Sequence, residues 1–174
     1  MTPEPDLLRH FIAALAYRTQ KALRGAPQSF SEFRAAPGVR TPRELVRHMT
    51  SVLGYANTFF VGGAYKAVPL ESLDAEVARF HATLEEFGAS VLRAGPMADP
   101  VTPAQLLQGP LADAMTHAGQ LALLRRLAGS PVPPENFLRA DISADNLTAN
   151  QAAPASPGRR DGTWDPRGVV DDSE

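Results

Sequence analysis

The chain has 174 residues, of which 44% are hydrophobic and 21% charged, and its formal net charge is −2 at pH 7. This composition predicts one or two compact domains, and so small a net charge argues against nucleic acid as a partner. The absence of cysteine excludes disulfides, cysteine-ligated zinc, iron–sulfur clusters and a cysteine nucleophile.

The first two predicted helices have clear start and stop signals. The first opens at Asp6 or the preceding Pro5 and ends at residues 25–27 (GAP), because glycine favours a helix C-cap and proline cannot continue a helix. The second opens at residues 41–44 (TPRE), a capping box in which the Thr hydroxyl and the Glu carboxylate accept hydrogen bonds from free backbone N–H groups. Its apolar residues recur at helical spacing until residues 62–63 (GG).

Two more helices are predicted after these. One spans about 72–94, where apolar residues alternate at steps of three and four. The other opens at a second capping box, residues 102–105 (TPAQ), bends at Gly109-Pro110 and runs to Ala128. Four helices with connections of moderate length predict an all-α fold, an up-and-down four-helix bundle.

The amino-acid composition of the chain changes after Gly129. Residues 130–174 hold four Arg against eight Asp or Glu, and six of the prolines. We therefore expect an extended chain here, with four apolar residues able to pack on the bundle: Phe137, Leu138, Ile142 and Leu147. The predicted organisation is a bundle with its packed segment over 1–150 and an acidic, proline-containing, flexible tail over 151–174.

Several enzyme signatures are absent from the sequence. Neither phosphate-binding glycine motif occurs, nor does G-x-S-x-G or H-E-x-x-H. Glu-x-x-His, which di-iron bundles repeat on two helices, is also missing. With no thiol available either, any metal must be held by His and carboxylate side chains.

Three residues form the candidate metal site. His48 falls in the apolar stripe of the second helix, while Asp113 and His117 are four apart on the last helix and so share one face. That face continues with Leu121 and Leu124, so we expect it to be buried, where an unpaired carboxylate would be costly. A divalent metal would solve this with two His and one Asp as ligands and leave positions open. The alternative is an Asp–His ion pair without metal.

Further residues can assist such a site. Gln120 follows His117 by one helical turn and can hydrogen-bond its ring, and Tyr55 follows His48 by seven residues on the same stripe. Four arginines surround the start of the second helix: Arg34, Arg40, Arg43 and Arg47. They can hold an anionic substrate, or they can be a solvated face.

Three segments resemble the DinB-like superfamily. Residues 111–129 (LADAMTHAGQLALLRRLAG) resemble its last core helix, residues 41–49 its second helix, and residues 131–142 the segment after the bundle. The resemblance implies a four-helix bundle, often dimeric, whose metal is held at the positions of His48, Asp113 and His117. Asp113 stands where His is commonest, and the ligand set favours zinc or nickel, then iron or manganese.

The resemblance also implies an activity. The superfamily includes metal-dependent transferases that use low-molecular-weight thiols such as bacillithiol or mycothiol. We therefore expect a homodimeric thiol-dependent transferase acting on a small electrophile, or a hydrolase; the alternative is a non-enzymatic metal-binding or dimerisation module of a stress response. No apolar run is long enough for a membrane span, and the acidic, Pro-rich start is unlike a signal peptide, so we expect a cytoplasmic protein with no membrane partner.

Overall fold

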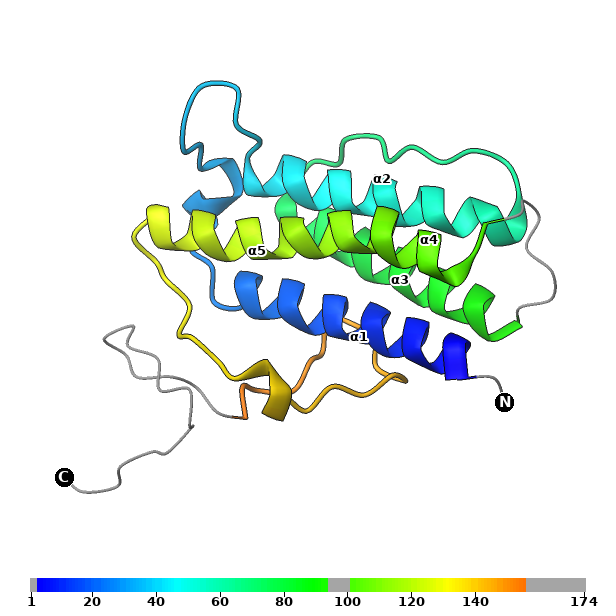
Figure 1. Ribbon diagram of the computed structural model, residues 1–174. Helices are drawn as coiled ribbons and strands as arrows, with labels where there is room; N and C mark the ends of the chain where they lie inside the picture. The colour runs from blue at the N-terminus through cyan, green and yellow to red at the C-terminus, as the bar shows by residue number, and fades with distance from the viewer. Residues whose placement is uncertain (1–2, 94–100, 156–174) are drawn as a thin grey trace, which may run out of the picture.

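The computed structural model describes residues 3–93 and 101–155 (Figure 1). Regular structure in these ranges is helical, and they form no strand. The long helices are α1 (Pro3–Leu23), α2 (Pro42–Val61), α3 (Leu73–Arg93) and α5 (Ala112–Leu127). The short helical turns are η1 (Gln28–Glu32), α4 (Pro103–Leu106), η2 (Leu107–Leu111) and η3 (Phe137–Arg139). None of the described helices is both long and apolar enough to cross a membrane.

The starts of α2 and α4 follow the local signals in the sequence, whereas α1 begins at Pro3, earlier than predicted. At the start of α2 the Glu44 N–H donates to Thr41 Oγ1 at 3.2 Å, and the Thr41 N–H donates to Glu44 Oε2 at 2.8 Å, which confirms the capping box. Thr102 and Gln105 form the second box. The predicted bend is also confirmed, because Gly109 leaves helical geometry (φ −95°, ψ −105°) just before the proline.

The core lies among the four long helices. α1 packs against α3 and α5, and α2 packs against the same two helices, so α1 and α2 lie diagonally across the bundle. The fully buried side chains at the centre include Ile12, Leu15, Met49, Leu53, Phe80, Phe87 and Leu121. The apolar stripes predicted from the sequence therefore meet in one core.

The direction of α3 differs from the expected up-and-down order. Arg43 at the start of α2 donates to the Glu71 carbonyl just before α3, and the rings of Phe60 and Phe87, near the opposite ends, are 5.8 Å apart. The two helices are thus parallel, and residues 62–72 return along α2 (Figure 1). A fully extended connection of 11 residues reaches about 36 Å. This is enough to run back along the whole of α2, which is roughly 30 Å long.

Side chains of α2 and α3 hold this crossover segment, residues 62–72. The Ala67 N–H donates to Ser51 Oγ on α2 at 3.1 Å. The Leu70 N–H donates at 2.9 Å to the buried carboxylate of Glu76, which also pairs with Arg79 on the next turn of α3. A buried carboxylate needs such partners, so these bonds fix the path of the crossover.

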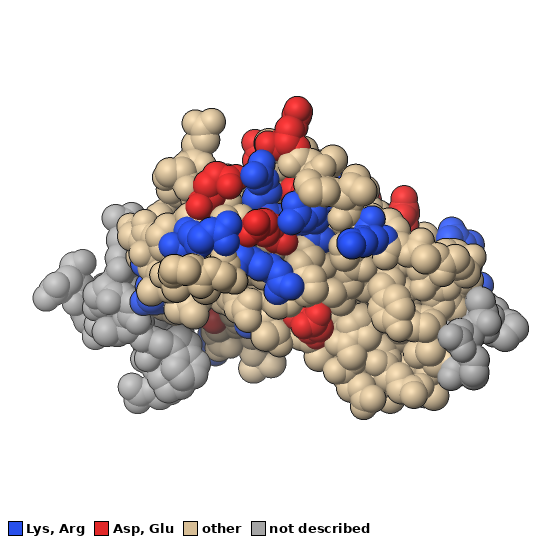
Figure 2. Space-filling model, turned by 90° about the horizontal axis from the view of Figure 1, so that it is seen from above, with Lys and Arg blue, Asp and Glu red and all other residues tan. Residues whose placement is uncertain are grey.

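Basic and acidic side chains are mixed on the face seen from above (Figure 2). Of the four arginines near the start of α2, Arg34 pairs with Glu44 and Arg43 pairs with Glu32. Two of the four therefore have structural partners. Arg40, by contrast, forms no ion pair within the described ranges.

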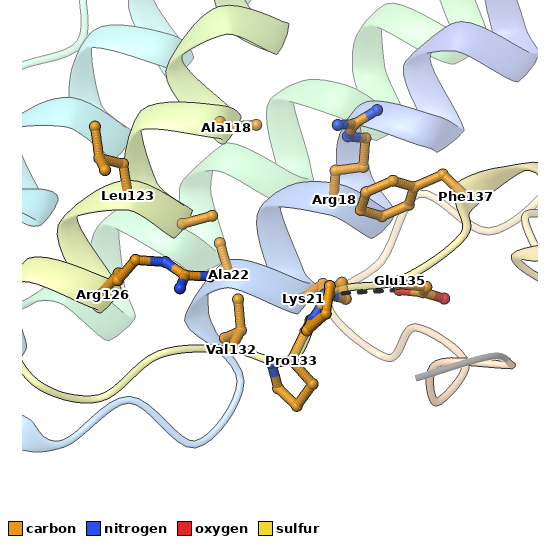
Figure 3. A pocket seen from close by; sticks show the side chains of 13 residues that line it. Arg18, Lys21, Ala22, Ala118, Leu123, Arg126, Val132, Pro133, Glu135 and Phe137 are labelled. Carbon is orange, nitrogen blue, oxygen red and sulfur yellow. Dashed lines mark hydrogen bonds and ion pairs between the residues drawn. The ribbon is translucent and has the colours of Figure 1, made fainter. Parts of the chain in front are cut away.

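The chain after α5 is held against α1 (Figure 3). The buried carboxylate of Glu135 accepts a hydrogen bond from Tyr17 Oη at 2.6 Å, and Lys21 Nζ lies 3.8 Å from its other oxygen. The Arg18 guanidinium lies 4.0 Å from the centre of the Phe137 ring. Arg18 and Lys21, two of the three basic residues that line this cavity of about 300 Å³, thus hold the chain's own segment in place.

Farther along the chain, Leu147 packs against α3. Leu147 is buried against the core, and its carbonyl oxygen lies 2.7 Å from Nδ1 of His81. The predicted packing is therefore confirmed for Leu147, while Phe137 and Ile142 are partly buried. It is wrong for Leu138, which is 92% exposed because the turn η3 directs Phe137 toward α1 and its neighbour outward. Residues 156–174, most of the predicted tail, lie outside the described residues.

Candidate metal centre

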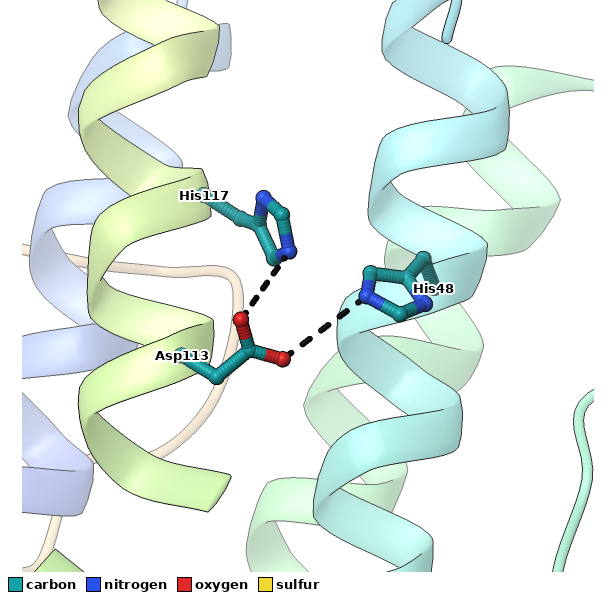
Figure 4. Close-up of side chains that lie close together, drawn as sticks. All are labelled: His48, Asp113 and His117. Atoms are coloured by element: carbon teal, nitrogen blue, oxygen red, sulfur yellow. Dashed lines mark ion pairs between the residues drawn. The ribbon is translucent and has the colours of Figure 1, made fainter. Parts of the chain in front are cut away.

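α2 and α5 bring the three predicted ligand residues together (Figure 4). His48 projects from α2, and Asp113 and His117 project from successive turns of α5. One ligand atom from each residue lies within 4.8 Å of the other two. The helical spacing explains the Asp–His pair, and the packing of α2 on α5 supplies the third residue.

The separations suit a metal ion. Asp113 presents one oxygen to each ring: Oδ1 is 3.3 Å from His117 Nε2 and Oδ2 is 3.7 Å from His48 Nε2. Two ligand atoms on a tetrahedral zinc ion are about 3.4 Å apart. The two rings are nearly perpendicular, with centres 4.8 Å apart. Two nitrogens and a carboxylate thus lie close enough together to be candidate ligands of a small divalent cation.

A hydrogen bond from His117 to Gln120 indicates which nitrogen of the ring faces the site. His117 Nδ1 lies 2.8 Å from Gln120 Oε1. An amide oxygen can only accept, so Nδ1 carries the proton and Nε2 of the neutral ring has an unshared pair directed at Asp113. A metal ion bound between this nitrogen and the carboxylate would offset the repulsion between them.

The environment of His48 favours its neutral form. Burial lowers the pKa of His48 below its ordinary value, and the charge of Arg40 and the ring of His117 lower it further, against the opposing effect of Asp113. Metals bind the neutral imidazole, so this shift reduces the competition from protons.

The site is more open than expected. The side chain of Asp113 is 47% exposed, that of His48 31% and that of His117 10%. The buried stripe of α5 runs through Ala114 and Ala118, which places Asp113 at its edge. The expectation that this whole face is buried is therefore wrong, because the Asp113 carboxylate is exposed to solvent. The open side gives access to water or a small molecule.

The other predicted site residues differ in their positions. Gln120 contacts the site as predicted. Tyr55 is 53% exposed and packs its ring against Phe59, with 4.9 Å between centres. In the described part of the chain neither Tyr55 nor Arg47 has a side-chain hydrogen bond to the three ligand residues. Tyr55 is about 10 Å along the helix from His48, too far for direct contact.

A cavity of about 580 Å³ beside Gln120 was not predicted from the sequence. Its lining includes Leu123 and Leu127, which are more than half exposed. These two leucines are four residues apart and off the core stripe of α5. That spacing is the signal by which the sequence could have revealed the cavity.

Comparisons with known proteins add no relative. No family model, no curated protein and no solved structure matches this chain. The described residues thus define an all-helical protein with a His–Asp–His group that could hold a metal.

Proposed function

We propose that this protein is a DinB-like metalloprotein that binds one divalent metal through His48, Asp113 and His117. The observation that carries the proposal is the convergence of three ligand atoms from two helices within 4.8 Å. The resemblance of residues 41–49 and 111–129 to that superfamily supports it. The ligand set of two imidazoles and one carboxylate suits zinc or nickel first, and iron or manganese next.

The proposed activity is the transfer of a low-molecular-weight thiol to a small electrophile, or hydrolysis. Three protein ligands leave coordination positions for water or a thiol, and a metal there lowers the pKa of either. The sequence has no cysteine, so the thiol must come from outside. In this proposal Gln120 orients His117, Asp113 lies on the open side, and the protein acts as a cytoplasmic homodimer.

Two alternatives make different predictions. A non-enzymatic metal-binding or dimerisation module would hold the metal without turnover. A plain ion pair between Asp113 and His117, favoured by their 3.3 Å separation at helical spacing, would hold no metal.

Elemental analysis of untagged protein, purified without added metal, tests the proposal. We expect near-stoichiometric zinc, nickel, iron or manganese in the wild type and its loss in H48A and H117A. H10A is the matched control, because His10 is exposed on α1 away from the site. No metal in the wild type, and none taken up on titration with zinc or nickel, would overturn the metal centre.

Activity and assembly need separate measurements on the metal-loaded protein. Thiol conjugation to 1-chloro-2,4-dinitrobenzene, or ester hydrolysis, should occur in the wild type and disappear in H48A. Bound metal without turnover of either kind would favour the non-enzymatic module. Sedimentation equilibrium tests the proposed homodimer.

A further inference from the structure

The cavity of about 580 Å³ lies between α5 and the loop that leads into α2. Its size falls within the range of sites that hold small molecules. The lining residues are Ala35, Gly38, Val39, Arg40, Leu45, Gln120, Leu123, Leu124 and Leu127. Apolar side chains thus form most of its wall, with two polar side chains among them.

The cavity adjoins the candidate metal centre. Gln120, which accepts the hydrogen bond from His117, also lines the cavity. Leu45 of the cavity wall precedes His48 by one turn of α2. A molecule in the cavity would therefore lie beside the candidate metal centre, on the side of Gln120.

Part of the apolar wall faces solvent. Leu123 is 54% exposed, Leu127 56% and Val39 39%, and all three line this cavity. Leu45 and Leu124 on the inner wall are buried. Exposed apolar side chains gathered around one hollow are typical of a ligand site, because a ligand removes them from water.

The charge of the cavity is positive. Among its described lining residues Arg40 is the one charged side chain, and it forms no ion pair in the ranges that the structure describes. The neighbouring Arg34 and Arg43, by contrast, are paired with carboxylates. A guanidinium at the rim of an apolar cavity is a natural partner for a ligand carboxylate.

We infer that the cavity binds a small molecule with an apolar body and one carboxylate, the body on Leu123 and Leu127 and the carboxylate on Arg40. Because the cavity lies beside the candidate metal centre, it would serve as the substrate subsite, and this role rests on the proposed function. Binding itself depends only on the cavity.

Calorimetric titration of the metal-loaded protein with octanoate tests this inference. Octanoate should bind saturably, R40Q should weaken binding about tenfold, and L123Q and L127Q should each weaken it several-fold. R139Q and L138Q are the matched controls, because both side chains are exposed on η3, outside the cavity, and should leave binding unchanged. Acetate has the carboxylate alone and should bind far more weakly than octanoate, which separates the cavity from simple ligation of a metal.

Each other outcome has a definite meaning. Absence of saturable octanoate binding, equal binding in R40Q, or acetate binding as tightly as octanoate would overturn the inference. Metal content measured on the same samples keeps the two hypotheses apart. Arg40-dependent octanoate binding by protein that takes up no metal on titration would support the ligand site and overturn the metal centre. A full metal complement without octanoate binding would overturn the ligand site alone.

Discussion

Gln120 orients the ring of His117 from one helical turn away, because its Oε1 accepts a 2.8 Å hydrogen bond from Nδ1 of that ring. The bond leaves Nε2 free to face Asp113 and limits rotation of the ring. Partners of this kind orient metal-ligating histidines and commonly raise metal affinity by about 10- to 100-fold.

Removing the acceptor should therefore weaken the proposed metal site. We expect Q120L to lower zinc affinity by roughly 10- to 100-fold, measured by competition with a chromophoric chelator. Q120E keeps an acceptor at the same place and should bind zinc at least as tightly as the wild type. Equal zinc affinity in Q120L and the wild type would contradict this role.

Two glycines inside helices should respond in opposite ways to alanine. A Cβ on Gly54 of α2 would overlap the ring of Tyr65 in the crossover segment, whereas a Cβ on Gly119 of α5 meets no atom within 4 Å. We expect G54A to lower the free energy of unfolding by about 1–3 kcal/mol and G119A to raise it by about 0.5–1 kcal/mol.

Denaturant unfolding measures both changes. In a Y65A background the G54A substitution should cause no further loss of stability compared with Y65A alone, because the overlapping ring is then gone. A G54A protein as stable as the wild type would show that the crossover segment does not lie against α2 at this glycine.

Adjacent arginines in the last turn of α5 provide a matched pair. Arg125 is buried and donates at 2.9 Å to the carbonyl oxygens of Ala22, at the end of α1, and of Ser130. Lysine cannot reproduce this fork of donors, so R125K should lower the free energy of unfolding by about 1–3 kcal/mol. The exposed Arg126 is the control, and R126K should change stability by less than about 0.5 kcal/mol. Similar thermal melts of the two variants would disprove the bracing role of Arg125.

His81 should make stability depend on pH. Burial lowers its pKa below the ordinary value, despite opposing effects of the hydrogen bond to Leu147 and the charge of Glu85. As pH falls below about 6.5, the unfolded chain binds a proton that the folded protein excludes, so stability is lost toward acid. The slope for one such group is at most about 1.4 kcal/mol per pH unit.

Comparison of variants isolates this contribution. H81Q should lose less stability than the wild type between pH 7.5 and 5.5, measured by denaturant unfolding at each pH. H10Q replaces an exposed histidine and should follow the wild type. An unchanged pH dependence in H81Q would show that His81 is protonated as readily in the folded protein as in the unfolded chain.

The local features of this protein could be predicted because each depends on residues a few positions apart. The capping boxes at Thr41 and Thr102, the bend at Gly109 and the shared face of Asp113 and His117 all follow from helical spacing and backbone chemistry. The contact from Gln120 to His117 spans one turn and belongs to the same class.

The remaining features depend on how distant segments pack. The sequence by itself determined the helices and which residues could form a metal site, because these rest on local periodicity. Only the tertiary structure decided that α3 runs parallel to α2, that Asp113 is half exposed and that Tyr55 lies apart from the site. A helix pattern shows which face is apolar, whereas the direction of a neighbour and the exposure of an edge residue depend on which helices pack together.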